Sequence, residues 1–257
     1  MTTHTKVALI TGGSRGIGAA TALALAERGY DVALTYRNKA ARAKEVAAEI
    51  EQRGQHALPI GCDITRLDDV QRLFTDLKAW HNTLNILVLN ASGGMERDIL
   101  AVDPEYPMHI NHDAQLVLLE HALPLMTNGG TIVFVTSHWA HLYGQMEQIP
   151  AYAPVAKSKC AGEQALRTQQ DALAEHGIRL LVVTGDLIEG TITPKLLERA
   201  APGLTERRRT TIGPLPTATE MGKAIAQAAV DPSLPSGHTV VVGGSLKSQL
   251  TSDTNFL

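Results

Sequence analysis

Residues 6–18 read KVALITGGSRGIG, a short apolar run that ends in a glycine-rich turn and continues directly into a helical pattern. Gly12 permits a tight turn, and Gly16 and Gly18 let a ligand approach the backbone N–H groups at the start of the helix. A plain turn between a strand and a helix would also use glycine. The order strand, loop, helix favours a loop that binds the pyrophosphate of a dinucleotide.

Six further apolar runs alternate with helical segments along the rest of the chain. Each run is continuously apolar, which is typical of strands buried on both faces of a parallel sheet. The stretches between the runs carry apolar residues at helical spacing, and several of them stop at glycine. We therefore predict an α/β fold with a doubly wound, seven-stranded parallel sheet. The strand candidates are residues 6–11, 31–36, 56–63, 85–92, 130–137, 178–185 and 238–244.

Length and composition fit one large domain over residues 1–257. The chain of 257 residues is 44% hydrophobic and 19% charged, enough for a sizeable core. The formal net charge of -3 predicts no nucleic-acid partner, and we interpret the basic cluster ERRR (206–209) as a solvated loop rather than a clamp for a substrate phosphate. Cys62 and Cys160 lack the spacing of metal ligands, so we expect no disulfide framework and no metal. Without an export signal or an apolar run of roughly 18 residues, we expect a cytoplasmic protein with no membrane partner.

The longest stretch without a strand candidate is residues 187–216, which follow the sixth strand and are rich in Thr, Pro and Arg. Ligands of open α/β sheets bind beyond the carboxyl ends of the strands. We therefore expect residues 187–216 to form a mobile lid over the substrate.

The end of the second strand indicates which dinucleotide binds. It reads TYRN and offers no Asp or Glu where an acid would accept hydrogen bonds from an adenosine ribose. Arg37 stands there instead, and Arg15 lies in the glycine-rich loop. Two guanidinium groups near the ribose suit a 2′-phosphate, which favours NADP(H) over NAD(H). The alternative is that both arginines are only solvated.

Two further motifs, CDIT (62–65) and NASG (90–93), follow the glycine-rich loop TGGSRGIG in order. With these three motifs the chain resembles the short-chain dehydrogenase/reductase family over nearly its whole length. The resemblance implies a Rossmann-type fold, with Asp63 accepting from the adenine amino group and Asn90 stabilising the central strand. The cofactor-binding residues that it implies are Gly12, Ser14, Arg15, Gly16, Ile17, Gly18, Arg37, Asp63, Ile64, Asn90, Ala91, Ser92, Lys159, Asp186 and Thr191, with Thr193 as an alternative to Thr191.

Four residues are candidates for the catalytic roles known in the family. INHDAQ carries Asn111, and GTIVFVTS ends in Ser137. Tyr152 is followed by two lysines, neither of them four residues on. On a helix, a residue seven positions on is displaced by about -20°, whereas one five positions on is turned by about 140°. Lys159 therefore points with Tyr152, and Lys157 points away.

The spacing of this pair departs from the family's usual pattern. Counting back from HGIR (176–179) puts Lys159 at the family's lysine and Val155 at its usual tyrosine. Tyr152-x6-Lys159 thus replaces Tyr-x3-Lys and resembles the branch of the family that contains many bacterial enoyl-thioester reductases.

A proline complicates the position of the tyrosine. Pro154 suits a first helical position and biases Ala153 away from the helix, so Tyr152 can precede the helix. Tyr152 is then either the proton donor or a packing residue at the rim of the pocket. In the second case Tyr143 is the reserve donor.

The resemblance implies an acid-assisted hydride transfer. The charge of Lys159 would lower the pKa of the Tyr152 phenol, so that Tyr152 donates a proton at neutral pH. Ser137 would hydrogen-bond the substrate oxygen, and NADPH would supply the hydride. Asn111 would hold a water that links Lys159 to solvent.

Two local features depart from the family or add to it. Gly185 and Asp186 replace its usual Pro-Gly, and Asp186 would stabilise a cationic oxidised nicotinamide, unless it only bonds the nearby backbone of a turn. His138, Trp139 and Tyr143 follow Ser137 as substrate-pocket candidates, with loop packing as the alternative. A metal at His138 and His141 would need a third ligand that the sequence does not offer.

Three functions fit these residues. The first is an NADPH-dependent reductase of a carbonyl, either a 3-oxoacyl thioester or a secondary-metabolite ketone. The second is an enoyl-thioester reductase, favoured by the Tyr-x6-Lys spacing but opposed by the intact glycine loop and NASG segment. The third is a cofactor-binding protein without turnover, a sensor or scaffold. The family resemblance also implies a homo-oligomer, a tetramer or a dimer.

Overall fold

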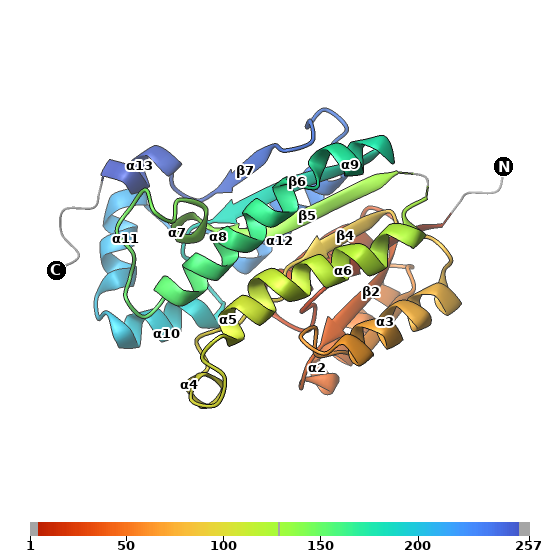
Figure 1. Cartoon of the computed structure of the whole chain (residues 1–257), viewed down its shortest axis with the longest axis horizontal. Coiled ribbons are helices and arrows are strands. Elements are labelled where there is room, and N and C mark those ends of the chain that lie inside the picture. Colours follow the sequence, from red (N-terminus) through yellow and green to blue (C-terminus); the bar gives the residue numbers. More distant parts are fainter. Residues whose placement is uncertain (1–4, 128, 252–257) are drawn as a thin grey trace.

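The computed structural model describes residues 5–127 and 129–251. Seven parallel strands form one sheet in the order β3-β2-β1-β4-β5-β6-β7, which confirms the predicted doubly wound arrangement (Figure 1). The strands are β1 (Lys6–Ile10), β2 (Tyr30–Tyr36), β3 (Ala57–Gly61), β4 (Ile86–Leu89), β5 (Gly130–Ser137), β6 (Ile178–Gly185) and β7 (Thr239–Val242).

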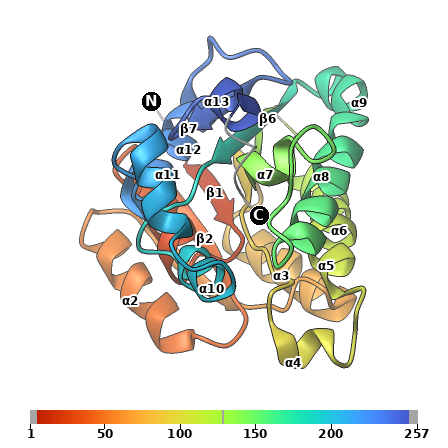
Figure 2. The ribbon, with the colours of Figure 1, turned by 90° about the vertical axis from the view of Figure 1, so that its left-hand side faces the viewer.

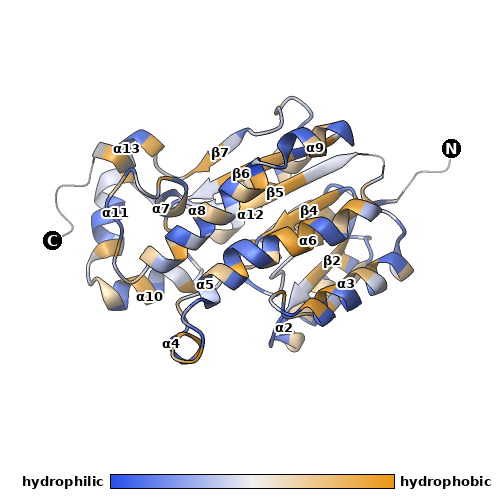
Figure 3. Cartoon of the chain, viewed as in Figure 1, coloured by the Kyte–Doolittle hydropathy of each residue, from blue (hydrophilic) through white to orange (hydrophobic). Residues whose placement is uncertain are grey.

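Long helices cover both faces of the sheet. On one face lie α1 (Gly16–Ala26), α2 (Ala40–Glu51) and α12 (Ala218–Val230), and on the other α3 (Leu67–Trp80), α6 (Ala114–Ala122) and α8 (Ala153–Arg167). Because successive strand residues point to opposite faces, β1 contributes Val7 and Leu9 to one apolar core and Ala8 and Ile10 to the other. Figure 3 shows the middle strands mostly orange between helices whose surfaces alternate between blue and orange.

Shorter elements connect the long ones. Helices α10 and α11 lie together at the end of the molecule that faces the viewer in Figure 2. They occupy the segment that was expected to form a lid. The remaining elements are α4 (Arg97–Leu100), α5 (Tyr106–Met108), the π-helix η1 (His109–Asp113), η2 (Leu123–Leu125), α7 (His138–His141), α9 (Gln170–Glu175), α10 (Ile192–Ala200), α11 (Leu204–Ile212) and α13 (Leu246–Thr251).

The interpretation of ERRR as a solvated loop is wrong, because these residues belong to α11. Arg208 is buried, and its guanidinium donates to both carboxylate oxygens of Asp186, with 2.6 Å between Nη2 and Oδ2. The guanidinium carbon also lies 5.9 Å from the centre of the Trp139 ring. The neighbouring Arg207 and Arg209 are exposed. A buried ion pair therefore fastens α11 to the end of β6.

Arg208→Met should lower the free energy of unfolding by about 3–5 kcal/mol, because it takes the guanidinium partner from a buried carboxylate. Denaturant unfolding measures the change, and the matched control is Arg207→Met, which should stay within about 0.5 kcal/mol. Arg208→Met combined with Asp186→Leu removes both charges and should be more stable than Arg208→Met alone. A loss below about 1 kcal/mol in Arg208→Met would mean that this pair does not hold α11.

Candidate active site

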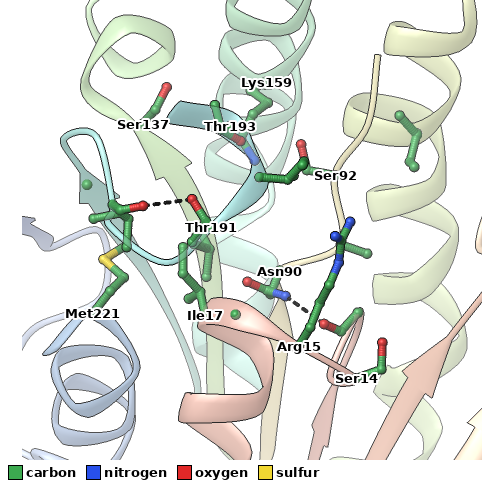
Figure 4. Close-up of a pocket in the computed structure, with 18 of the residues that line it drawn as sticks. Ser14, Arg15, Ile17, Asn90, Ser92, Ser137, Lys159, Thr191, Thr193 and Met221 are labelled. Carbon is green, nitrogen blue, oxygen red and sulfur yellow. Dashed lines mark hydrogen bonds between the residues drawn. The ribbon is translucent and has the colours of Figure 1, made fainter. Parts of the chain in front are cut away.

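A cavity of about 680 Å³ lies at the carboxyl ends of the strands. Its walls come from the loop between β1 and α1, from the ends of β2 to β6, and from the segment that leads from β6 into α10. In Figure 4, Ser14 and Arg15 lie at one end of the view, and Ser137, Lys159 and Thr193 lie at the other. One cavity therefore joins the glycine-rich loop to the candidate catalytic residues.

The glycine-rich loop leaves room for a phosphate beside its backbone. Gly12 and Gly16 have φ angles of 67° and 56°, which glycine adopts without strain. A Cβ atom on Gly18 would lie 2.3 Å from the carbonyl oxygen of Gly12, so α1 can start this close to the loop only with glycine. This geometry fits a pyrophosphate bound at the start of α1. The loop residues that line the cavity are Gly12, Ser14, Arg15, Gly16 and Ile17, whereas Gly18 supports the turn from outside the lining.

Asn90 joins β4 to the same loop. Its Nδ2 donates to the carbonyl oxygens of Thr11, at 2.8 Å, and Gly12, at 3.3 Å. The Asp63 carboxylate accepts hydrogen bonds from the backbone and the hydroxyl of Thr65, which holds one of its oxygens in place. Five expected cofactor residues line the cavity just after β3 and β4. They are Asp63, Ile64, Asn90, Ala91 and Ser92.

Basic side chains gather where β2 ends. Arg15 and Arg37 both line the cavity, and so do Lys39 and Arg42, which we did not predict. The sequence YRNKAAR (36–42) does contain this signal, because it sets three basic residues close together. The cluster gives this end of the cavity the charge that a phosphate group requires.

Two unpredicted side chains contact Arg37 in this cluster. Arg37 Nη1 donates to the hydroxyl of Tyr106 at 2.5 Å, and Nη2 lies 3.9 Å from Oε1 of Glu96. Tyr106 and Glu96 both line the cavity. They come from the segment GGMERDILAVDPEY (93–106), in which we recognised no motif, so no local signal pointed to them.

Tyr152 and Lys159 line the same cavity, whereas Lys157 is exposed. Tyr152 directly precedes α8, and its hydroxyl donates to Ser137 Oγ at 3.1 Å. The Ser137 oxygen also accepts the N–H of Ala140 at 3.2 Å, which caps α7. The two hydroxyls and the lysine therefore belong to one site, although the usual Tyr-x3-Lys spacing is missing.

The start of α8 differs in part from the sequence expectation. Ala153 is helical and Pro154 takes the second helical position instead of the first, so the expected bias of Ala153 away from the helix is wrong, whereas Tyr152 does precede the helix. Val155, at the family's usual tyrosine position, is buried in an apolar cluster and is not among the described residues that line the cavity.

Burial shifts the pKa values of the two ionisable groups in opposite directions. It raises the pKa of Tyr152, and the hydrogen bond with Ser137 lowers it. Burial also lowers the pKa of Lys159 to about 8, against the charge of Glu163, which raises it. That Lys159 itself lowers the pKa of Tyr152 stays a prediction.

Glu163 lies one helical turn after Lys159 on α8, and sequence reasoning missed it. Its carboxylate is buried and contacts Nδ1 of His141 at 2.9 Å and Nε of Arg167 at 2.9 Å. The guanidinium of Arg167 also donates hydrogen bonds to the carbonyl of Gly237 and the hydroxyl of Thr239. A buried negative charge is thus held beside the candidate catalytic lysine.

Asn111 is not among the described residues that line the cavity, but it contacts Ser92, which does line it, and Ser158 on α8. It sits in the π-helix η1, where its side chain contacts Ser92, the backbone of Gly93 and the Ser158 hydroxyl. A Cβ atom on Gly162 would lie 2.1 Å from the Asn111 carbonyl oxygen, so α8 approaches this turn as closely as backbones allow. Asn111 therefore fixes the loop after β4 to the helix that carries Lys159.

Asp186 and Thr191 both line the cavity. We expected the Asp186 carboxylate to face a cationic ring, but in the structure it is paired with Arg208 and accepts the N–H of Leu187 at 2.7 Å. Its negative charge is therefore compensated, and the expected electrostatic role loses its basis. The Thr191 hydroxyl donates to the carbonyl of Ile188 at 2.8 Å. Thr193, the second residue of α10, also lines the cavity (Figure 4).

Of the three pocket candidates after Ser137, only Trp139 is among the described residues that line the cavity. His138 is fully buried between the hydroxyl of Thr184, at 3.0 Å, and the carbonyl of Gly243, at 3.2 Å, so it is a packing residue. Tyr143 packs against the apolar cluster that contains Tyr152 and Trp139. The substrate-pocket expectation is therefore wrong for His138 and Tyr143.

Within residues 5–127 and 129–251, no group of three or more His, Cys, Asp or Glu residues could hold a metal ion. No helix there is long and apolar enough to cross a membrane. Both cysteines are free thiols.

Known sequences match the chain across this site. A family model described as short chain dehydrogenase matches residues 6–200. A hydroxynaphthalene reductase-like protein of Metarhizium robertsii is 37% identical over 166 residues, which are 63% of this chain and 61% of that protein. The 1-cyclohexenylcarbonyl-CoA reductase of Streptomyces collinus is 32% identical over 190 residues, which are 72% of this chain and 65% of that protein. The chain thus spans less than two thirds of the length of these relatives.

Solved structures match nearly the whole chain. The promiscuous reductase LugOII, which catalyses keto-reduction at C1 during lugdunomycin biosynthesis, is 30% identical with a TM-score of 0.75, over 94% of this chain and 98% of that one. A 7α-hydroxysteroid dehydrogenase complexed with NADH and 7-oxo glycochenodeoxycholic acid is 27% identical with a TM-score of 0.81, over 93% of both chains. Together with the family-model match over most of its length, these similarities show that the chain belongs to the short-chain dehydrogenase family of nicotinamide-dependent oxidoreductases.

Proposed function

We propose that this chain is an NADPH-dependent reductase that converts a carbonyl group to an alcohol. The observation that carries the proposal is the hydrogen bond between Tyr152 and Ser137 in the cavity that the glycine-rich loop and Lys159 also line. Two hydroxyl groups that can donate hydrogen bonds and a cation beside a dinucleotide site are the groups that hydride transfer to a carbonyl needs.

The choice of NADPH rests on the basic end of the cavity. Arg15, Arg37, Lys39 and Arg42 line it where β2 ends, and guanidinium groups suit a phosphate monoester. An acid at the end of β2, which would favour the unmodified ribose, is missing from the sequence TYRN. We therefore propose NADPH, although the similar 7α-hydroxysteroid dehydrogenase was solved with NADH.

Bound NADPH would supply the hydride that the carbonyl carbon accepts. Tyr152 would turn its one phenolic proton from Ser137 Oγ to the carbonyl oxygen of the bound substrate, where negative charge develops. Ser137 Oγ would keep the hydrogen bond from Ala140 N–H and donate its own proton to the same oxygen. Lys159 keeps a positive charge near the tyrosine and favours the phenolate that forms.

The wall of the cavity near Ser137 supports an apolar, ring-shaped substrate. Trp139, Leu187, Ile192 and Leu197 line the cavity, and they present aromatic and aliphatic surface. The names of similar proteins refer to hydroxynaphthalene, cyclohexenylcarbonyl and steroid compounds. We propose a cyclic secondary-metabolite ketone ahead of a linear 3-oxoacyl thioester.

A second candidate function is enoyl-thioester reduction. The Tyr152-x6-Lys159 spacing favours it, and the Streptomyces collinus relative is named as a 1-cyclohexenylcarbonyl-CoA reductase. The intact glycine-rich loop and the NASG segment favour the ketone. Substrate panels separate the two, because hydride is added to a carbon–carbon double bond in one case and to a carbonyl in the other.

We also propose that α10 is the moving part of a lid formed by residues 187–216. Gly190 and Gly203 flank α10 with φ angles of 81° and 80°, and no atom lies within 4 Å of a Cβ built on Gly190. The following α11 is fastened by the pair of Arg208 and Asp186. Glycines at both ends can absorb the backbone rotation of a closing helix, whereas a buried ion pair resists it.

Tyr152→Phe should reduce kcat/KM for ketones by about 100-fold to 10000-fold, because it removes the proton donor. Lys159→Ala should cause a loss in the same range. NADPH oxidation with bulky cyclic ketones, 3-oxoacyl thioesters and enoyl thioesters measures both losses and identifies the reaction. If Tyr152→Phe keeps full activity, Tyr152 is not the donor. If NADPH binds and no compound turns over, the chain is a cofactor-binding protein instead.

Adding Val155→Tyr to Tyr152→Phe should not restore this activity, although it rebuilds the usual Tyr-x3-Lys spacing. Val155 is buried in an apolar cluster, so a larger side chain would overpack this part of the core. The same assay tests the double variant, with thermal melting to show that it folds. Recovery of turnover would mean that the site tolerates the usual geometry and that Tyr152 is not required.

Ketone reduction should fall as pH rises through about 8, because Lys159 has a pKa of about 8 and loses its charge above it. Glu163→Gln removes the carboxylate that raises this pKa, so the fall should move to lower pH. The pH dependence of kcat/KM measures both midpoints. Glu175→Gln removes the same charge from an exposed position on α9 and should leave the midpoint unchanged. Equal midpoints in wild type and Glu163→Gln would contradict the coupling.

A further inference from the structure

Arg37 is held between a phenol and a carboxylate that both reach the cofactor end of the cavity. Its Nη1 donates to the hydroxyl of Tyr106 at 2.5 Å, and its Nη2 lies 3.9 Å from Glu96 Oε1. Arg37 belongs to the end of β2, whereas Glu96 and Tyr106 come from the segment after β4. Residues outside β2 therefore contact the arginine at the end of this strand.

Both partners of Arg37 are fixed in place. The Glu96 Oε2 atom accepts the N–H of Gly94 at 2.7 Å and the N–H of Met95 at 3.0 Å, so the loop backbone orients the carboxylate. Tyr106 is 5% exposed and packs in the apolar core beneath the cavity, so its ring cannot swing away from Arg37. By contrast, the Arg37 and Glu96 side chains are 35% and 37% exposed, and a ligand can reach the space between them.

We propose that Glu96 and Tyr106 are specificity-determining residues for the cofactor, with opposite effects: Tyr106 positions Arg37 for a 2′-phosphate, and Glu96 competes with that phosphate for Arg37. This inference rests on the proposed use of NADPH. The preference for NADPH over NADH is then smaller than the basic residues alone would produce.

Charge explains why the two residues act in opposite directions. A phosphate monoester carries about -1.5 to -2 charges at neutral pH, so Glu96 repels it and also attracts Nη2, the guanidinium arm that the phosphate would bind. The Tyr106 phenol is neutral and engages the other arm, Nη1, so it does not compete with the phosphate for Nη2. An arginine already held in place loses less side-chain freedom when the phosphate binds.

NADH offers a ribose hydroxyl in place of this phosphate. Glu96 does not repel this neutral hydroxyl, and Arg37 cannot form an ion pair with it. Substitutions at Glu96 and Tyr106 should therefore change NADPH affinity and leave NADH affinity nearly constant.

The test is calorimetric titration of NADPH and NADH into the whole chain as wild type, Glu96→Gln and Tyr106→Phe. Glu96→Gln should tighten NADPH binding by about two- to fivefold at low salt, with a smaller effect at high salt. Tyr106→Phe should weaken NADPH binding by about two- to tenfold. Both variants should bind NADH within about twofold of wild type. The matched control is Glu105→Gln, an exposed carboxylate beside Tyr106, which should leave the ratio of the two affinities unchanged.

An Arg37→Met background separates this inference from the assignment of the cofactor. If wild type binds NADPH and NADH equally well and Arg37→Met changes neither, the assignment of NADPH fails. If wild type prefers NADPH but Glu96→Gln does not raise the ratio, or Tyr106→Phe does not lower it, the inference fails alone. In support of it, Glu96→Gln should lose its effect once Arg37 is replaced by Met. Thermal melting of each variant shows that it is folded before it is titrated.

Discussion

The hydrogen bonds between Thr11 and Asn90 join β1 to β4 at the point where the strand order reverses, and the cavity is built on this junction. The Thr11 hydroxyl accepts the N–H groups of Asn90 and Ala91 at 3.0 Å, and the Asn90 amide returns a bond to the Thr11 carbonyl at 2.8 Å. The chain leaves these two strands in opposite directions, so their loops diverge and open a crevice between them. Because the junction is fixed, the glycine-rich loop and Ser92 can line the same cavity.

Features that depend on local sequence could be predicted well. The strands were visible because each is a continuous apolar run, and the glycine-rich loop was visible because its turn needs residues that tolerate positive φ. The difference between Lys157 and Lys159 follows from helix periodicity, and in the structure the first is exposed and the second buried. Tyr152 precedes the helix as predicted, although Pro154 is the second helical residue and Ala153 is helical.

Features that depend on a distant partner could not be predicted. Arg208 lies in a basic cluster typical of a solvated surface, and only the fold brings it to Asp186 and away from water. Glu96 and Tyr106 reach Arg37 from a segment without a recognisable motif. In each case the local pattern is ordinary, and the contact depends on how separate elements of the chain pack together.

The charged row on α8 has a consequence beyond the site itself. Lys159, Glu163 and Arg167 are spaced four residues apart, so they follow one face of the helix over about 12 Å. Arg167 ends the row on the carbonyl of Gly237 and the hydroxyl of Thr239, at the start of the edge strand β7. The contacts of Arg167 therefore link the Glu163 carboxylate beside Lys159 to the edge of the sheet. We therefore expect substitutions in the turn before β7 to change the charge environment of Lys159 through Arg167 and Glu163, without changing any residue that lines the cavity.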